Sequence, residues 1–125
     1  MLQLSSRERR EIMKPWLSKV AALFQSRLYW SAARSAQQRL SIFAIVVAAQ
    51  NDIRLPRRCE LHTAIDLLTD AGLLSRRDSE ALLWCDSFLE CVLSHHVDVT
   101  TRIEQLARVI REIADLTDAF SELEF

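Results

Sequence analysis

The chain has very few of the turn residues that connect β-strands. Its 125 residues include one glycine and two prolines, whereas an all-β or α/β domain of this size needs many turn residues. It also lacks a long apolar run, because the longest one, residues 42–49, has only eight residues and is too short to span a bilayer. No charged-then-apolar signal peptide is recognisable. These absences favour an all-α protein without a membrane span, and we expect it in the cytoplasm.

Cysteine and glycine also limit the chemistry. Three cysteines, an odd number, suit a reducing compartment better than a disulfide framework. A single glycine cannot build a phosphate-binding loop, and we expect no cofactor. Half of the residues are hydrophobic and about a quarter are charged, which is typical of a packed domain. We therefore expect one compact bundle of about five helices over residues 1–125, with residues 1–13 as a candidate N-terminal helical arm.

The two halves of the chain carry opposite charge. Residues 1–60 contain eleven Lys and Arg against four Asp and Glu, a net +7, and residues 61–125 contain five against thirteen, a net −8. One interpretation is that the halves pack together and their charged rims complement each other. The other is that one half presents a patch to a partner of opposite charge.

Residues 61–93 have the pattern of an antiparallel helical hairpin around the only glycine. Apolar residues at 61, 64, 65 and 68 mark one helix face. Gly72 then suits the left-handed conformation that closes a helix. Ser75 followed by Asp78 resembles the start of a second helix. A loop this short predicts two neighbouring antiparallel helices.

Before the hairpin we expect a short helical turn followed by two main helices. A short helical turn over 7–13 would precede a main helix that starts at Lys14 or Pro15. One helix over 15–50 would be about 54 Å long, too long for a compact domain of this size. We therefore expect a turn or kink between Trp30 and Ser35. Residues 40–49 are apolar almost all round, which predicts the central helix of the bundle.

The last helix has heptad spacing. Its stripe consists of Ile103, Leu106, Ile110, Ile113, Thr117 and Phe120. Fewer than three heptads are short for an independent coiled coil, so the stripe either docks against the protein's own bundle or leaves part of its surface for a partner helix.

Two Cys/His pairs raise the alternative of a metal site. Cys59 and His62 are three residues apart at the start of the hairpin, and Cys91 and His95 are four apart at its end. Antiparallel helices bring these ends together, so the four side chains form a candidate tetrahedral zinc site. Free cysteines are also common in apolar cores, and our first expectation is therefore that no metal is bound.

Arg57 and His62 are separated by four residues, a spacing that resembles the Arg-x4-His motif of HEPN domains. The resemblance covers six residues and implies a helical, metal-independent RNase, in which both side chains act on the phosphodiester at a dimer interface. Arg58 stands where that family usually has a polar residue. A nuclease, or a regulator associated with nucleic acid, is our alternative function, although the acidic half of the chain disfavours a polyanion.

No reactive constellation stands out, and apolar helix surface is plentiful. We therefore expect a small non-enzymatic protein-binding module, an adaptor, chaperone or regulator, whose partner is another protein or a second copy in a homodimer. Tyr29 and Trp30 are adjacent on a helix, so one of them must face outward, and exposed aromatic residues are typical of interfaces. The candidate contact residues are Arg27, Tyr29, Trp30 and Arg34 in the basic half, and Ile103, Leu106, Ile110, Ile113 and Phe120 in the last helix.

Overall fold

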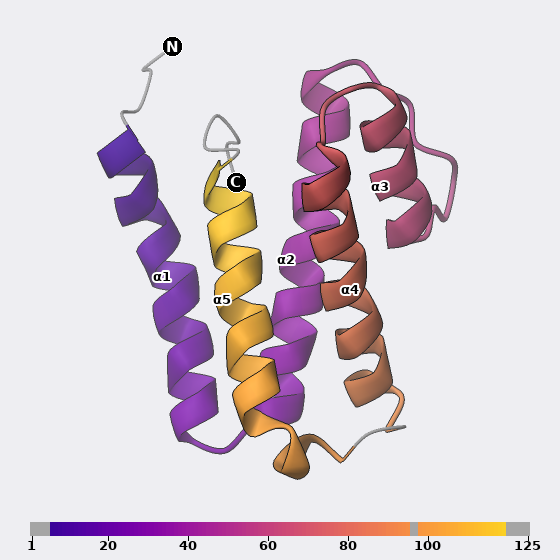
Figure 1. Ribbon diagram of the computed structural model, residues 1–125. Coiled ribbons are helices and arrows are strands. Elements are labelled where there is room, and N and C mark those ends of the chain that lie inside the picture. The colour runs from indigo at the N-terminus through magenta and orange to yellow at the C-terminus, as the bar shows by residue number, and fades with distance from the viewer. Residues whose placement is uncertain (1–5, 96–97, 120–125) are drawn as a thin grey trace.

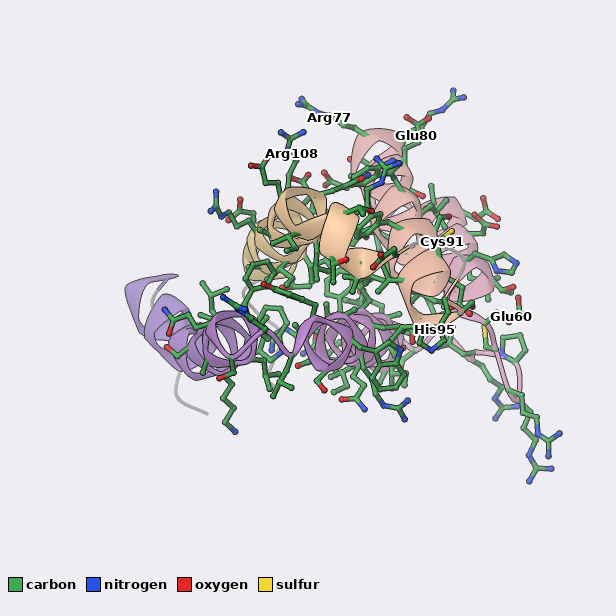
Figure 2. The ribbon with its side chains drawn as sticks, turned by 90° about the horizontal axis from the view of Figure 1, so that it is seen from below. Glu60, Arg77, Glu80, Cys91, His95 and Arg108 are labelled. Carbon is green, nitrogen blue, oxygen red and sulfur yellow. The ribbon has the colours of Figure 1, made fainter. Side chains whose placement is uncertain are left out.

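The fold is an all-α bundle arranged in two layers. The computed structural model describes residues 6–95 and 98–119, and in this part of the chain every regular element is helical. The elements are α1 (Ser6–Gln25), α2 (Tyr29–Gln50), α3 (Leu61–Asp70), α4 (Arg76–Leu93), a short 3-10 helix η1 (Val99–Thr101) and α5 (Ile103–Ala119). α1 and α2 form one layer, and α5, α4 and α3 lie side by side in the other (Figures 1 and 2).

α2 is the central helix, as its apolar sequence predicted. It packs against α1, α3, α4 and α5. The first half of its inner face is built from Ala32, Ala33 and Ala36, which are fully buried and whose small side chains let neighbouring helices approach closely. Leu40 and Phe43 then fill the middle of the core. α2 therefore contributes side chains to the hydrophobic core along most of its length.

The turn between α3 and α4 confirms the predicted hairpin. Gly72 has φ 76°, and its N–H donates to the Thr69 carbonyl at 3.0 Å while the Leu73 N–H donates to the Leu68 carbonyl at 3.0 Å. This pair of bonds is a Schellman closure with glycine in the left-handed position. Ser75 then caps α4, because its hydroxyl accepts the Asp78 N–H at 3.0 Å.

The break between α1 and α2 lies before the predicted interval. Residues 26–28 form the turn and α2 begins at Tyr29, so the expected kink between Trp30 and Ser35 is wrong. Arg27 has φ 60°, and the Leu28 N–H donates to the Leu23 carbonyl at 2.9 Å. This is the same type of closure with arginine in the left-handed position, so no glycine marks it in the sequence.

α1 also starts earlier than expected. It runs without interruption from Ser6 through Pro15 to Gln25, so residues 6–13 belong to the main helix and do not form a separate turn. Proline cannot donate to the carbonyl four residues before it. α1 is held to α2 by Trp16, whose Nε1–H donates to Ser35 Oγ at 3.2 Å and whose ring lies 5.1 Å from the buried Arg39 guanidinium carbon. This cation–π contact places a charge of the basic half inside the bundle.

The seam between α1 and α5 is less completely filled. A shallow groove of about 250 Å³ runs between the helices and is lined by Leu17, Phe24, Ala107 and Ile110, among others. Leu17 on its rim is exposed. None of the helices described is long and apolar enough to cross a membrane.

Gly72 and Arg27 both have positive φ, and we expect substitutions at these two positions to have opposite effects on stability. Gly72→Ala should lower the free energy of unfolding by about 1 kcal/mol, because alanine is strained at positive φ, although a Cβ there meets no atom within 4 Å. Arg27→Gly should leave stability unchanged or raise it by up to about 1 kcal/mol, because it removes the same strain. Urea unfolding measures both, and equal destabilisation by the two substitutions would contradict the conformational explanation.

Candidate functional site

Most of the heptad stripe of α5 is buried in the hydrophobic core. Leu106 and Ile113 are completely buried and Ile110 is 5% exposed, while Ile103 is half-buried. Phe120 lies outside the described residues. The stripe docks against the protein's own bundle because α5 fits between α1 and α4 and over α2. The prediction that these side chains form a contact surface is therefore wrong for Leu106, Ile110 and Ile113.

The aromatic pair at the start of α2 divides as expected. Tyr29 is half-buried and packs edge-to-face against Phe24, with ring centroids 5.0 Å apart. Trp30 points outward and is 39% exposed. The guanidinium carbon of Arg34 lies 5.6 Å from the Trp30 ring centroid, close enough for a cation–π interaction. Arg27 is exposed in the turn just before them.

Further along α2, large apolar side chains also face solvent. Ile42 is 47% exposed and Ile45 is 58% exposed. With Trp30, Arg34 and Gln38 they share one side of the helix, since positions three and four apart are neighbours on a helical surface. We call these five residues the outer stripe of α2. It lies opposite the buried side of α2, which includes Ala36, Leu40 and Val47.

The outer stripe leads into a pocket beside α2, which we call the loop pocket. It measures about 400 Å³ and is lined by Ser41, Ala44, Ile45, Leu55, Pro56, Arg58, Cys59, Leu61 and Ala64. The long connection over residues 51–60 forms its outer wall, and α2 and the start of α3 form the rest. Ile45 belongs both to the outer stripe and to the pocket, so the two make one continuous surface.

Arginines flank this surface at both ends. Arg34 lies beside Trp30, and Arg54, Arg57 and Arg58 are exposed on the connection over residues 51–60. Within the described part of the chain, none of these four guanidinium groups has an ion pair or a hydrogen bond. They are therefore available to acidic groups of a ligand.

A second hollow lies between α4 and α5. Trp84 is 48% exposed and stacks on Phe88, with ring centroids 6.2 Å apart. Two grooves of about 290 and 530 Å³ meet beside Trp84, Arg102 and Gln105. Arg108 from this hollow extends away from the α1–α2 layer (Figure 2). Glu104 also lines it, so its charge is mixed, unlike that of the outer stripe.

The resemblance to the Arg-x4-His motif gains no geometric support. Arg57 lies in the connection before α3, whereas His62 is in the first turn of α3. The His62 ring is exposed, with Nδ1 3.2 Å from a Glu60 carboxylate oxygen. Neither Arg57 nor His62 lines the loop pocket or the other grooves described here.

An acidic group lies near His62 instead. Burial is the main cause that raises the pKa of Asp86, and the negative charge of Glu90 adds to it, while His62 and a hydrogen bond with Gln37 oppose it. Gln37 also donates to Glu90 Oε2 at 2.6 Å. Gln37 therefore links α2 to Asp86 and Glu90 of α4, on the side of the bundle where α3 begins.

The four Cys and His residues of the candidate zinc site do not converge. In the described chain, no three His, Cys, Asp or Glu side chains are placed to hold a metal ion. Cys59 faces the loop pocket, whereas Cys91 faces the groove between α4 and α5. His95 lies in the turn after α4, where it is exposed and has φ 59°. The hairpin brings the helix ends together but turns the two cysteines towards different neighbours.

The third cysteine is inert. Cys85 is fully buried, and burial, with the charges of Glu112 and Asp86 as smaller causes, raises the pKa of its thiol to about 12. It therefore stays protonated and unreactive at neutral pH. Cys59 and Cys91 are half-exposed free thiols.

Comparison with known proteins adds no functional assignment. No protein-family model matches the chain, and no curated protein or solved structure is significantly similar to it. The candidate site therefore depends on the geometry alone.

Asp86 predicts a pH-dependent effect. The raised pKa means that the folded state binds this proton more tightly than the unfolded chain does, so the contribution of Asp86 to stability falls as pH rises above 3.8, its ordinary pKa. Asp86→Asn should therefore raise the melting temperature by up to a few degrees at pH 7 and lose this advantage below pH 3.8. Asp66→Asn, at an exposed position on α3, is the control. A lower melting temperature for Asp86→Asn at pH 7 would show that the carboxylate is stabilising.

The two apolar stripes should respond differently to truncation. Leu106→Ala leaves a cavity in the core and should cost about 2–5 kcal/mol of unfolding free energy. Ile45→Ala, at an exposed position, should change it by less than about 0.5 kcal/mol. Urea unfolding of dilute protein measures both. A large loss for Ile45→Ala would mean that the outer stripe is already covered.

Proposed function

We propose that the protein is a non-enzymatic protein-binding module, an adaptor, chaperone or regulator, that binds its partner through the outer stripe of α2. The observation that carries this proposal is the exposure of Ile42 and Ile45 on α2, the helix that packs against four others. A helix on the surface of an isolated bundle normally has polar residues on its outer side. Here that side carries Ile42 and Ile45 beyond Arg34 and Gln38, with an aromatic residue at one end and a pocket at the other.

The energetics favour a covered stripe. Burying one large aliphatic or aromatic side chain contributes about 1.5–3 kcal/mol, and Trp30, Ile42 and Ile45 each keep 39% or more of their surface exposed. Tryptophan and arginine are enriched among residues that dominate binding energies, and Trp30 and Arg34 are in contact. The unpaired arginines around the stripe would orient an acidic partner and speed its association through charge attraction.

The alternative function, RNA cleavage by Arg57 and His62, has less support. A general acid or base has to be positioned within hydrogen-bond reach of its substrate. Arg57 lies on an irregular connection and His62 is exposed beside Glu60. The outer stripe therefore carries the stronger proposal, and its partner is a different protein or a second copy of this chain.

A photo-crosslinking amino acid at position 45 tests the proposal in cells that express the protein. We expect one or a few discrete protein adducts, and we expect Ile42→Asp in the same chain to reduce them at least about tenfold, since charge in an interface centre costs several kcal/mol. The same crosslinker at position 77 is the control, because Arg77 projects from the opposite side (Figure 2). Identical adducts from positions 45 and 77 would refute binding through the outer stripe. An adduct of two copies of this chain would identify a homodimer.

A further inference from the structure

We infer that the outer stripe and the loop pocket together bind an acidic amphipathic α-helix of a partner protein, with one large apolar side chain in the pocket and carboxylates opposite the arginines at both ends. This inference rests on the proposed function and adds the chemistry and the shape of the ligand. Three features of the surface carry it: its length, its pocket and its charge.

The length of the surface suits a helix. From Trp30 to Ile45 the stripe covers fifteen residue steps of α2, or about 22 Å at 1.5 Å per residue. A partner helix of about 15 residues that lies along α2 covers this distance in four turns. Apolar residues near one end of that helix then meet Trp30, and a second group about three turns further along meets Ile42 and Ile45, in the helix-in-groove mode of recognition.

The loop pocket selects one side chain of that helix. Its walls include Ala44, Leu55, Pro56 and Leu61, and Cys59 closes part of it. Such a lining offers few hydrogen-bond partners and favours an apolar group. Since Ile45 stands on its rim, a leucine or phenylalanine that enters the pocket also buries Ile45.

The charges define the rest of the ligand. Arg34 stands near one end of the stripe and Arg58 lines the pocket at the other, with Arg54 and Arg57 nearby in sequence. In the described chain these guanidinium groups have no acidic partner of their own. Glutamate or aspartate near both ends of the ligand helix would complement them, whereas lysine would be repelled.

Other ligands fit this surface less well. A nucleic acid would meet the arginines, but its phosphates leave Ile42 and Ile45 without an apolar partner. A bilayer is flat on this scale and does not fill a concave pocket. The acidic helix α5 of a second copy is not a suitable ligand, because its apolar side is buried.

The cysteines provide the experiment. Cys59 lines the loop pocket and Cys91 lines the α4–α5 groove, so one alkylation assay reads both sites at once, and buried Cys85 serves as the unreactive reference. The probes are two designed 16-residue helical peptides with the same leucine stripe, one flanked by glutamates and the other by lysines. We expect the acidic peptide at saturation to slow iodoacetamide modification of Cys59 at least about fivefold and to leave Cys91 unchanged. The lysine peptide should protect neither cysteine.

Two variants test the charges and the apolar contact separately. Arg34→Gln with Arg58→Gln should weaken binding of the acidic peptide roughly tenfold and reduce its salt dependence. Ile45→Asp should abolish protection of Cys59. All variants are at exposed positions, and circular dichroism verifies that they fold.

The outcomes separate this inference from the proposed function. Equal protection by both peptides, or protection that the two arginine substitutions leave unchanged, overturns the recognition of an acidic helix. So does stronger protection by polyuridylate RNA or by phosphatidylserine vesicles than by the acidic peptide. If no peptide protects Cys59 while a crosslinker at position 45 still captures a protein, the inference fails and the proposed function stands. Loss of that capture refutes the proposed function itself.

Discussion

The bundle depends on one constraint: α2 has to pack against four other helices at once. α2 meets this constraint with a buried side that runs along its length, from Ala32, Ala33 and Ala36 through Leu40 and Phe43 to Val47. The two-layer arrangement leaves one side of α2 uncovered. The exposed isoleucines on that side are thus a consequence of how the core is built, besides forming the surface that we propose for binding.

The same constraint explains how the other amphipathic helix is used. α5 has its heptad stripe buried because it fits between α1 and α4 over the inner face of α2. A helix with a broad apolar stripe is a good candidate for an interface in a sequence, but in a bundle whose central helix needs covering it becomes core. Consequently the apolar stripe of α5 is not available for binding, and exposed large apolar side chains remain on α2 at Trp30, Ile42 and Ile45, as well as at Leu17, Leu28 and Trp84.

Sequence pattern predicts those parts of the fold that local chemistry determines. The hairpin follows from Gly72 and the Ser75 cap, and the central position of α2 follows from its apolar run. The end of α1 could not be found in this way, because Arg27 occupies the left-handed position without a side chain that announces it. The outer stripe was missed for a different reason: Ile42 and Ile45 lie in a run that is apolar all round, so only the packing of α2 reveals which side is exposed. The direction of Cys91 likewise depends on how α4 is rotated, and that of Cys59 depends on the path of the connection over residues 51–60.

The incompletely filled seam between α1 and α5 has a consequence for the order in which the bundle opens. α1 contacts only α2 and α5 extensively, and one of these seams contains a groove. Contacts between α1 and α5 also close a loop of most of the chain, whereas those of the α3–α4 hairpin are local and cheap in entropy. We therefore regard α1 as the least cooperative element, held by the buried side chain of Val20 and by Trp16 against Ser35 and Arg39. Its detachment would be a partial unfolding event that leaves the hairpin intact and uncovers apolar surface of α2 and α5.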